Sequence, residues 1–276
     1  MLHFSLLKMV FLKFEMFLVI FILVLTLLYK KNGTFLYYFK YILYVGLSNI
    51  IVILVLPIFM FRPKNIHNLL IASYTCSWIT KIVEIHWELR GKEHLEQDRG
   101  CIIVSNHQSA FDILGMYQIW PIMKKCTAIA RRELFYVWPF GLAAWLAGLI
   151  FIDRRNAEKA RLLINDTAKY VKEKKIKLWI YPEGTRRNTG EIHPFKKGAF
   201  YAAIHGQIPI LPIVFSSYYF LSSKEKKFDS GRVIIKTLPA ISTEGMTIDD
   251  VNKLLEKTQN VMSETLRELN REIQSS

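Results

Sequence analysis

The sequence has few cysteines and lacks the short motifs that mark several common classes of protein. Its 276 residues contain three cysteines, Cys76, Cys101 and Cys126, and none has the CxxC spacing of a zinc or redox site. Two of them lie in apolar runs and are predicted to be buried, reduced core residues. No zinc-finger, RNP-like or HExxH pattern is present, and there is no internal repeat or low-complexity segment. The sequence therefore gives no support to a nucleic-acid-binding module.

Acidic residues are scarce beside basic ones. The chain has 23 Asp and Glu against 37 Lys and Arg, a formal net charge of +14 that is not gathered in one tail. This charge predicts an anionic partner, which can be nucleic acid, lipid headgroups or a phosphorylated substrate. Because 51% of the residues are apolar, we favour a lipid surface over nucleic acid.

Two uncharged runs near the N-terminus predict a membrane anchor. The first, Met16–Tyr29, has 14 residues and is short for a full span, which needs about 20. The second, residues 41–61, has 21 residues between two basic residues and is long enough to cross a membrane as a helix. A buried helix of a soluble domain is the alternative for the second run. We predict a membrane-embedded helical hairpin within residues 1–66 and a separate domain over residues 67–276.

The rest of the chain alternates short apolar runs with helical patterns. Strands are expected at 84–89, 101–105, 126–130, 178–181, 210–215 and 233–238. Amphipathic patterns predict helices over 153–175 and 248–273, and Thr247 and Asp250 have capping-box spacing before the second. The expected fold class is α/β, a central mixed sheet with flanking helices, preceded by the membrane hairpin.

A histidine and an aspartate follow the predicted strand 101–105. In the run Ser-Asn-His-Gln-Ser-Ala-Phe-Asp, His107 and Asp112 are five residues apart, so the two side chains would not share one helical face. They meet only if His107 lies on a turn and Asp112 in the first turn of the next helix, which Ser109 would cap. A histidine oriented by a carboxylate is a general base. Such pairs also arise by chance, so this one alone does not establish catalysis.

A second polar cluster, Tyr181-Pro-Glu-Gly-Thr-Arg186, follows the predicted strand 178–181. Two polar clusters at strand ends are typical of α/β sites. Gly184 would let backbone amides approach a phosphate, Thr185 offers a hydroxyl, and Arg186 offers a bidentate fork. Taken alone, this run is equally a polar turn with an ion pair.

Together with two further blocks, these clusters resemble the glycerolipid acyltransferases, most of all those that act on 1-acyl-glycerol-3-phosphate. Residues 148–154 (Gly-Leu-Ile-Phe-Ile-Asp-Arg) resemble the second motif of that family, and residues 208–214 (Ile-Pro-Ile-Leu-Pro-Ile-Val) resemble the fourth. The four blocks occur in the family's order over residues 105–215. The resemblance implies transfer of an acyl group from acyl-CoA to the sn-2 hydroxyl of lysophosphatidic acid, which gives phosphatidic acid.

The resemblance also implies roles for individual residues. His107 would be the base on the acceptor hydroxyl and Asp112 its orienting partner. Glu183, Gly184, Thr185 and Arg186 would bind the acceptor, with Glu183 holding Arg186, a backbone turn or a glycerol hydroxyl. Three further cations are expected to contact phosphate groups of the acceptor or of CoA: Arg154, Arg131 and Arg132. In relatives a Lys-Lys pair often stands where this chain has Arg131 and Arg132.

The partners implied are acyl-CoA as co-substrate, lysophosphatidic acid and a lipid bilayer, with no cofactor, no metal and no nucleic acid. The expected location is the endoplasmic reticulum membrane with the catalytic domain facing the cytosol. The uncharged run 134–152 is long enough for a third span, but a single crossing there would separate the two polar clusters. Pro139, Gly141 and Gly148 also interrupt a straight helix. We predict that this run packs as core or dips into the interface and lines an acyl-chain pocket.

Three alternatives stay open. The acceptor could be glycerol-3-phosphate or another lysophospholipid. A basic membrane protein that binds anionic lipid without catalysis would fit the charge and the apolar N-terminus, but it leaves the two polar clusters unexplained. A metal-dependent hydrolase is a rival chemistry, because it could draw ligands from several side chains: His107, Asp112, Glu183, His193 and His205. We favour direct transfer over a covalent serine intermediate.

Overall fold

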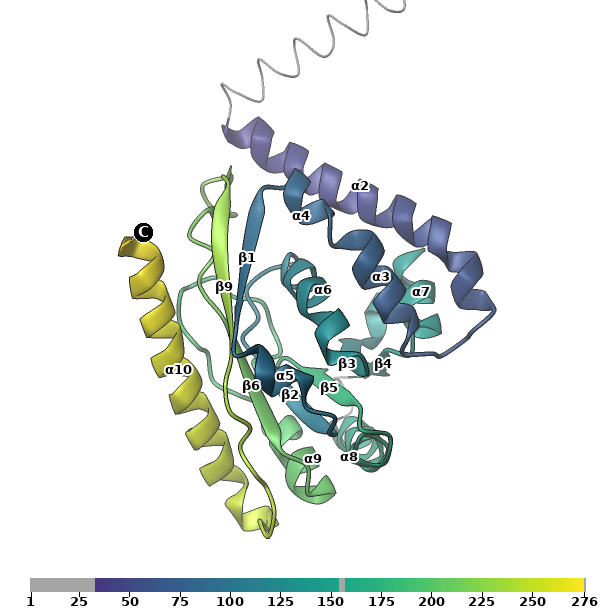
Figure 1. Cartoon of the computed structure of the whole chain (residues 1–276), viewed down its shortest axis with the longest axis vertical. Helices are drawn as coiled ribbons and strands as arrows, with labels where there is room; N and C mark the ends of the chain where they lie inside the picture. The colour runs from purple at the N-terminus through teal and green to yellow at the C-terminus, as the bar shows by residue number, and fades with distance from the viewer. Residues whose placement is uncertain (1–32, 154–156, 276) are drawn as a thin grey trace, which may run out of the picture.

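The computed structural model describes residues 33–153 and 157–275. The predicted first membrane segment and Arg154 therefore lie outside the described residues. A mixed sheet forms the centre of the molecule (Figure 1), with its strands in the order β1-β9-β6-β2-β5-β3-β4. The strands are β1 (Ile85–Arg90), β2 (Cys101–Ser105), β3 (Cys126–Arg131), β4 (Ile150–Ile152), β5 (Lys177–Ile180), β6 (Ile210–Phe215) and β9 (Gly231–Thr237).

The strand directions place both polar clusters at one edge of the sheet. Strands β6, β2, β5, β3 and β4 run parallel, β9 is antiparallel to β6, and β1 is parallel to β9. Val104 of β2 pairs with Ile180 of β5. Because these two strands end side by side, residues 106–112 and 181–186 leave the sheet next to each other. The predicted mixed α/β sheet is confirmed.

Helices cover both faces of the sheet (Figure 1). One face carries α3 (Asn68–Cys76), α4 (Ile79–Ile82), α6 (Asp112–Met123) and α7 (Phe140–Leu146), with α2 (Gly33–Met60) outside them. The other face carries α8 (Ala157–Lys174), α9 (Gly198–Gly206) and α10 (Val251–Ser275). Successive side chains of a strand point to opposite faces. Ile103 accordingly belongs to the apolar cluster on the first face and Ile102 to the cluster on the second.

The remaining elements are short. They are α5 (Lys92–Glu96), η1 (Arg132–Tyr136), η2 (Ile248–Asp250) and the two-stranded ribbon of β7 (Leu221–Ser222) and β8 (Lys227–Phe228). The predicted capping box is confirmed, since the side chains of Thr247 and Asp250 each accept the other residue's backbone N–H.

Helix α2 is longer than the predicted second membrane segment. It begins at Gly33 rather than at residue 41, so Lys40 lies inside it. The charge does not end the helix because it is paired: Lys40 is 1% exposed, and its Nζ lies 2.7 Å from Glu84 Oε2. Within the described residues α2 is the one helix long and apolar enough to cross a membrane. A helical hairpin is therefore not shown.

The uncharged run 134–152 does not form one helix. It contains the end of η1, then α7 and then β4, with a turn at Gly148 where φ is +77°. A single span across this run is therefore excluded, as predicted.

Candidate active site

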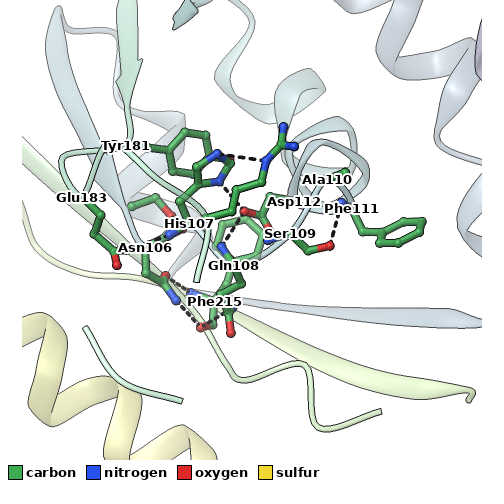
Figure 2. Close-up of polar contacts among 12 residues, drawn as sticks. Asn106, His107, Gln108, Ser109, Ala110, Phe111, Asp112, Tyr181, Glu183 and Phe215 are labelled. Atoms are coloured by element: carbon green, nitrogen blue, oxygen red, sulfur yellow. Dashed lines mark hydrogen bonds and ion pairs between the residues drawn. The ribbon is translucent and has the colours of Figure 1, made fainter. Parts of the chain in front are cut away.

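His107 and Asp112 form a hydrogen-bonded pair at the end of β2 (Figure 2). The His107 Nδ1 lies 2.6 Å from Asp112 Oδ2. His107 lies on the turn after β2, and Asp112 is the first residue of α6. This is the arrangement that the five-residue spacing requires. Asp112 is 2% exposed, so the carboxylate that holds the imidazole is shielded from water.

The same carboxylate also organises the turn. Asp112 Oδ2 accepts the Gln108 backbone N–H at 2.9 Å, and Oδ1 accepts the Ser109 N–H at 3.1 Å. Ser109 was predicted to cap α6, and that prediction is wrong. The residue at the N-cap is Phe111, which makes no side-chain cap, and Ser109 Oγ accepts only the Phe111 N–H at 3.3 Å. The amides at the start of the turn are held by Asp112 itself, so no serine cap is needed there.

Asn106 fixes the turn to the neighbouring strand β6. Its side-chain Nδ2 donates to the Phe215 carbonyl at 2.9 Å, and its Oδ1 accepts the Phe215 N–H at 2.9 Å (Figure 2). Gln108 Nε2 donates to the Ser216 carbonyl at 2.9 Å. The sequence reasoning missed these contacts, because no local signal links residues so far apart in the chain.

The His107 ring is fixed on two further sides. Tyr181 stacks on it with ring centroids 3.8 Å apart and planes 16° from parallel, and the Tyr181 hydroxyl donates to Met116 Sδ at 3.1 Å. Arg186 Nε donates to His107 Nε2 at 3.3 Å. Assigned from these partners, Nδ1 carries the proton toward Asp112 and Nε2 carries the lone pair. The side that can accept a proton therefore faces Arg186.

Glu183 connects the second polar cluster to the first. Its Oε1 accepts the His107 backbone N–H at 2.8 Å, and its Oε2 accepts the His193 N–H at 3.3 Å. Arg187 adds a second link, since its N–H donates to the His107 carbonyl at 2.8 Å. Of the three contacts considered for Glu183, the structure shows the one to a backbone turn. Burial raises the pKa of Glu183 to about 7, although the two N–H donors favour the carboxylate.

A cavity of about 690 Å³ opens beside His107. Apolar side chains of α2, α3, α6 and α7 line most of it, including Val55, Phe59, Leu69, Trp120 and Ala143. Leu134, Leu149 and Ile152, from the uncharged run 134–152, also line it. The run thus lines a deep apolar pocket, as predicted.

The predicted binding residues divide into three groups. Gly184, Thr185, Arg186 and Arg131 line the cavity together with His107 and Asp112. Glu183 and Arg132 do not line it, and Arg132 Nη1 lies 3.6 Å from Asp153 Oδ2. Arg154 lies outside the described residues.

The side chains suggested for a metal site are engaged elsewhere or dispersed. His193 Nε2 lies 2.7 Å from Thr189 Oγ1, and its Nδ1 lies 3.2 Å from Arg187 Nη1. Across residues 33–153 and 157–275, no three His, Cys, Asp or Glu side chains gather as metal ligands. All three cysteines are buried and free, which confirms the prediction made for two of them.

Comparison with known proteins identifies the class of protein to which this fold belongs. The family model described as Acyltransferase matches residues 86–216, which span β1 to β6 and include both polar clusters. A solved structure, PlsC, the 1-acyl-sn-glycerophosphate (LPA) acyltransferase of Thermotoga maritima, aligns with a TM-score of 0.61 and 19% identity. The alignment covers 83% of this chain and 97% of that one. The fold is thus that of an acyltransferase.

Curated relatives narrow the class to a family. The chain is 38% identical over 234 residues to human 1-acyl-sn-glycerol-3-phosphate acyltransferase alpha, covering 84% of this chain and 82% of the relative. It is 38% identical over 203 residues to the human beta form, covering 73% and 72%. The chain belongs to the 1-acyl-sn-glycerol-3-phosphate acyltransferase family.

Proposed function

We propose that the protein transfers an acyl group from acyl-CoA to the sn-2 hydroxyl of 1-acyl-glycerol-3-phosphate, giving phosphatidic acid and free CoA. The observation that carries the proposal is the place of the His107–Asp112 pair. It lies where a deep apolar cavity, suited to an acyl chain, meets Arg186 and Arg131, which are suited to phosphate. The names of the relatives support the acceptor.

The chemistry follows from the two faces of the imidazole. His107 Nε2 takes the proton of the acceptor hydroxyl as its oxygen attacks the thioester carbon. Asp112 holds Nδ1–H at 2.6 Å and stabilises the imidazolium that forms. When the carbon–sulfur bond breaks, the imidazolium returns the proton to the leaving CoA thiolate. No serine hydroxyl in the part of the chain that the structure describes bonds to the imidazole, which favours direct transfer over a covalent intermediate.

Arg186 has two partners in this scheme. Its Nε donates to His107 Nε2 at 3.3 Å, the nitrogen that must accept the hydroxyl proton. A phosphate that engages the guanidinium would draw this donor away, because charge-assisted contacts are the stronger ones. Binding of the correct acceptor would then free the base.

We further propose that the protein is held in a bilayer. Helix α2 buries one side against the domain and exposes apolar side chains on the other, including Ile42, Ile50, Leu54 and Ile58. The endoplasmic reticulum membrane, with the catalytic domain facing the cytosol where acyl-CoA is available, is the proposed location. The sequon Asn165-Asp166-Thr167 tests the orientation, because a glycan on Asn165 in a eukaryotic host would overturn it.

The function is tested by acyl transfer from labelled acyl-CoA with detergent-purified protein. Lysophosphatidate, glycerol-3-phosphate and lysophosphatidylcholine are offered side by side, with His107→Ala as the control. We expect transfer to lysophosphatidate, reduced about 10²–10⁴-fold in His107→Ala. Transfer to a different acceptor would correct the substrate and keep the mechanism. Folded wild-type protein that transfers to none of them would favour a lipid-binding protein without catalysis.

A further inference from the structure

A lysine outside the four sequence blocks reaches the same cavity. Lys196 lies just before α9, and its backbone N–H donates to the Pro182 carbonyl at 2.9 Å. That bond fixes the start of its side chain beside the turn that carries Gly184 and Arg186. Lys196 lines the cavity together with His107 and Arg131.

The side chain of Lys196 crosses the Gly184 turn closely. A Cβ atom built on Gly184 would lie 3.0 Å from Lys196 Cε and 3.1 Å from its Nζ. Gly184 also has φ of +75°, which an L side chain adopts only with strain. Glycine at this position therefore serves two purposes: it permits the turn, and it leaves room for the lysine. The Lys196 side chain is exposed, and its ammonium group lies against this turn.

The charges around this position are of one sign. Lys196, Arg186 and Arg131 line one cavity, and no carboxylate whose side chain the structure describes forms an ion pair with any of the three. Gathering like charges in a pocket costs free energy unless an anion compensates them. Arginine offers a planar fork and lysine a compact point charge, and both are used to bind phosphate.

We propose that Lys196 binds a phosphate group of a substrate in this cavity, an inference that rests on the proposed function. The group is either the phosphate monoester of the acceptor or one of the phosphates of CoA. Lys196 and Arg186, which both line the cavity, are then the two cations that locate the substrate relative to His107.

The test compares Lys196→Gln with Lys197→Gln. Lys197 is the adjacent residue, is exposed and does not line the cavity, so it controls for the loss of one surface charge. Steady-state kinetics are measured with lysophosphatidate as acceptor and two donors, acyl-CoA and the matching acyl-pantetheine, which lacks the nucleotide phosphates. We expect Lys196→Gln to raise one KM about tenfold, with kcat changed less than about threefold. Lys196→Arg should recover most of the loss.

The donor arms separate the two phosphate sources. A raised KM for lysophosphatidate with both donors assigns the contact to the acceptor. A raised KM for acyl-CoA, with that for acyl-pantetheine unchanged, assigns it to CoA. Unchanged KM values, or an equal change in Lys197→Gln, would overturn the proposal.

A failure of the proposed function would be distinguishable, because wild-type protein would then transfer to no acceptor. In that case equilibrium binding of lysophosphatidate and of neutral monoacylglycerol is measured on both variants. If Lys196→Gln binds lysophosphatidate more weakly than Lys197→Gln does, but binds monoacylglycerol equally well, the phosphate contact is still supported. Equal binding of lysophosphatidate by the two variants would contradict it.

Discussion

Two carboxylates hold the turn that carries His107, and their surroundings differ. Asp112 accepts two backbone N–H groups in addition to the imidazole, so its negative charge is compensated by the turn it organises. Glu183 accepts two N–H groups as well, but burial dominates and raises its pKa to about 7. One carboxylate therefore serves the imidazole directly, while the other joins the two polar clusters through the backbone of His107.

The shifted pKa of Glu183 predicts a dependence of stability on pH. Because the folded protein holds this proton more tightly than the unfolded chain, the stabilisation is fully present below about pH 4.5. It is lost as the pH rises through about 7. Allowing for partial screening by solvent, we expect a loss of about 1 kcal/mol across this range. Thermal unfolding of wild type and Glu183→Gln, measured from pH 5 to 8, checks this.

Glu183→Gln has no proton to lose at this position. The amount by which wild type is more stable than Glu183→Gln should therefore be larger at pH 5 than at pH 8. The mutant also replaces one acceptor oxygen with an NH₂ group, which lowers stability at every pH and does not affect the comparison. A constant difference between the two proteins across the range would contradict the prediction.

At the scale of single residues, the sequence predicts contacts between residues that are close together in the chain. The spacing of His107 and Asp112 was enough to predict their geometry, because only one arrangement lets them meet. The contact from Glu183 to the His107 N–H and the stacking of Tyr181 on the imidazole depend on the pairing of β2 with β5. No residue pattern predicts that pairing, and Lys196 was missed for the same reason. Asn106 was missed because its contact with Phe215 depends on the pairing of β2 with β6.

At the scale of elements, α2 contributes directly to the site. The Tyr44 hydroxyl donates to the Ala110 carbonyl at 3.0 Å, and its ring packs on Phe111 with centroids 4.7 Å apart. Both partners belong to the turn that carries His107. Val55 and Phe59, farther along α2, line the cavity. The helix thus supports the turn at one point and encloses the apolar pocket at another.

Tyr44→Phe is expected to reduce kcat several-fold and to cost about 1 kcal/mol of stability. The ring would remain against Phe111, but the Ala110 carbonyl would lose its partner and the turn would be held less firmly. Acyl transfer and thermal unfolding in detergent measure the two effects. Tyr38→Phe is the matched control, because Tyr38 is on the same helix and 49% exposed. Wild-type kinetics in Tyr44→Phe would mean that α2 anchors the protein without positioning the turn.

The sequence predicts the longer strands and misses the shortest ones. The predicted strands 101–105 and 210–215 match β2 and β6, because long apolar runs bounded by polar residues are distinctive. Strand β4 has three residues and β7 and β8 have two each, too few to show a periodicity. The start of α2 was misplaced because the partner of Lys40, Glu84, is far away in the sequence.

At the scale of the whole molecule, exposed apolar side chains gather near α2. Four successive residues from the end of η1 are exposed: Phe135 (40%), Tyr136 (70%), Val137 (51%) and Trp138 (70%). Element η1 packs on α7, and α7 packs on α2. Arg131 and Arg132 lie shortly before this segment in the chain, separated from Phe135 by Glu133 and Leu134. Aromatic side chains near cations are typical of a membrane–water interface. The composition of the sequence predicts contact with a membrane, but it does not show which surface makes that contact.

We therefore predict that residues 135–138 enter the interface when the protein is in a bilayer. The three native cysteines are at most 2% exposed, so a cysteine introduced by Tyr136→Cys can be labelled selectively with an environment-sensitive fluorophore. In vesicles that contain anionic lipid, its emission should shift to the blue, and nitroxide-bearing lipids should quench it. The control is Ile248→Cys, which is 64% exposed in wild type. Ile248 lies in η2, directly before α10, and α10 begins at the other end of the molecule from α2 (Figure 1). Equal emission and quenching at both positions would contradict the predicted orientation. A response at residue 136 alone would place this segment in the interface, and with it the neighbouring Leu134, which lines the apolar cavity, close to the lipid from which an acyl chain enters.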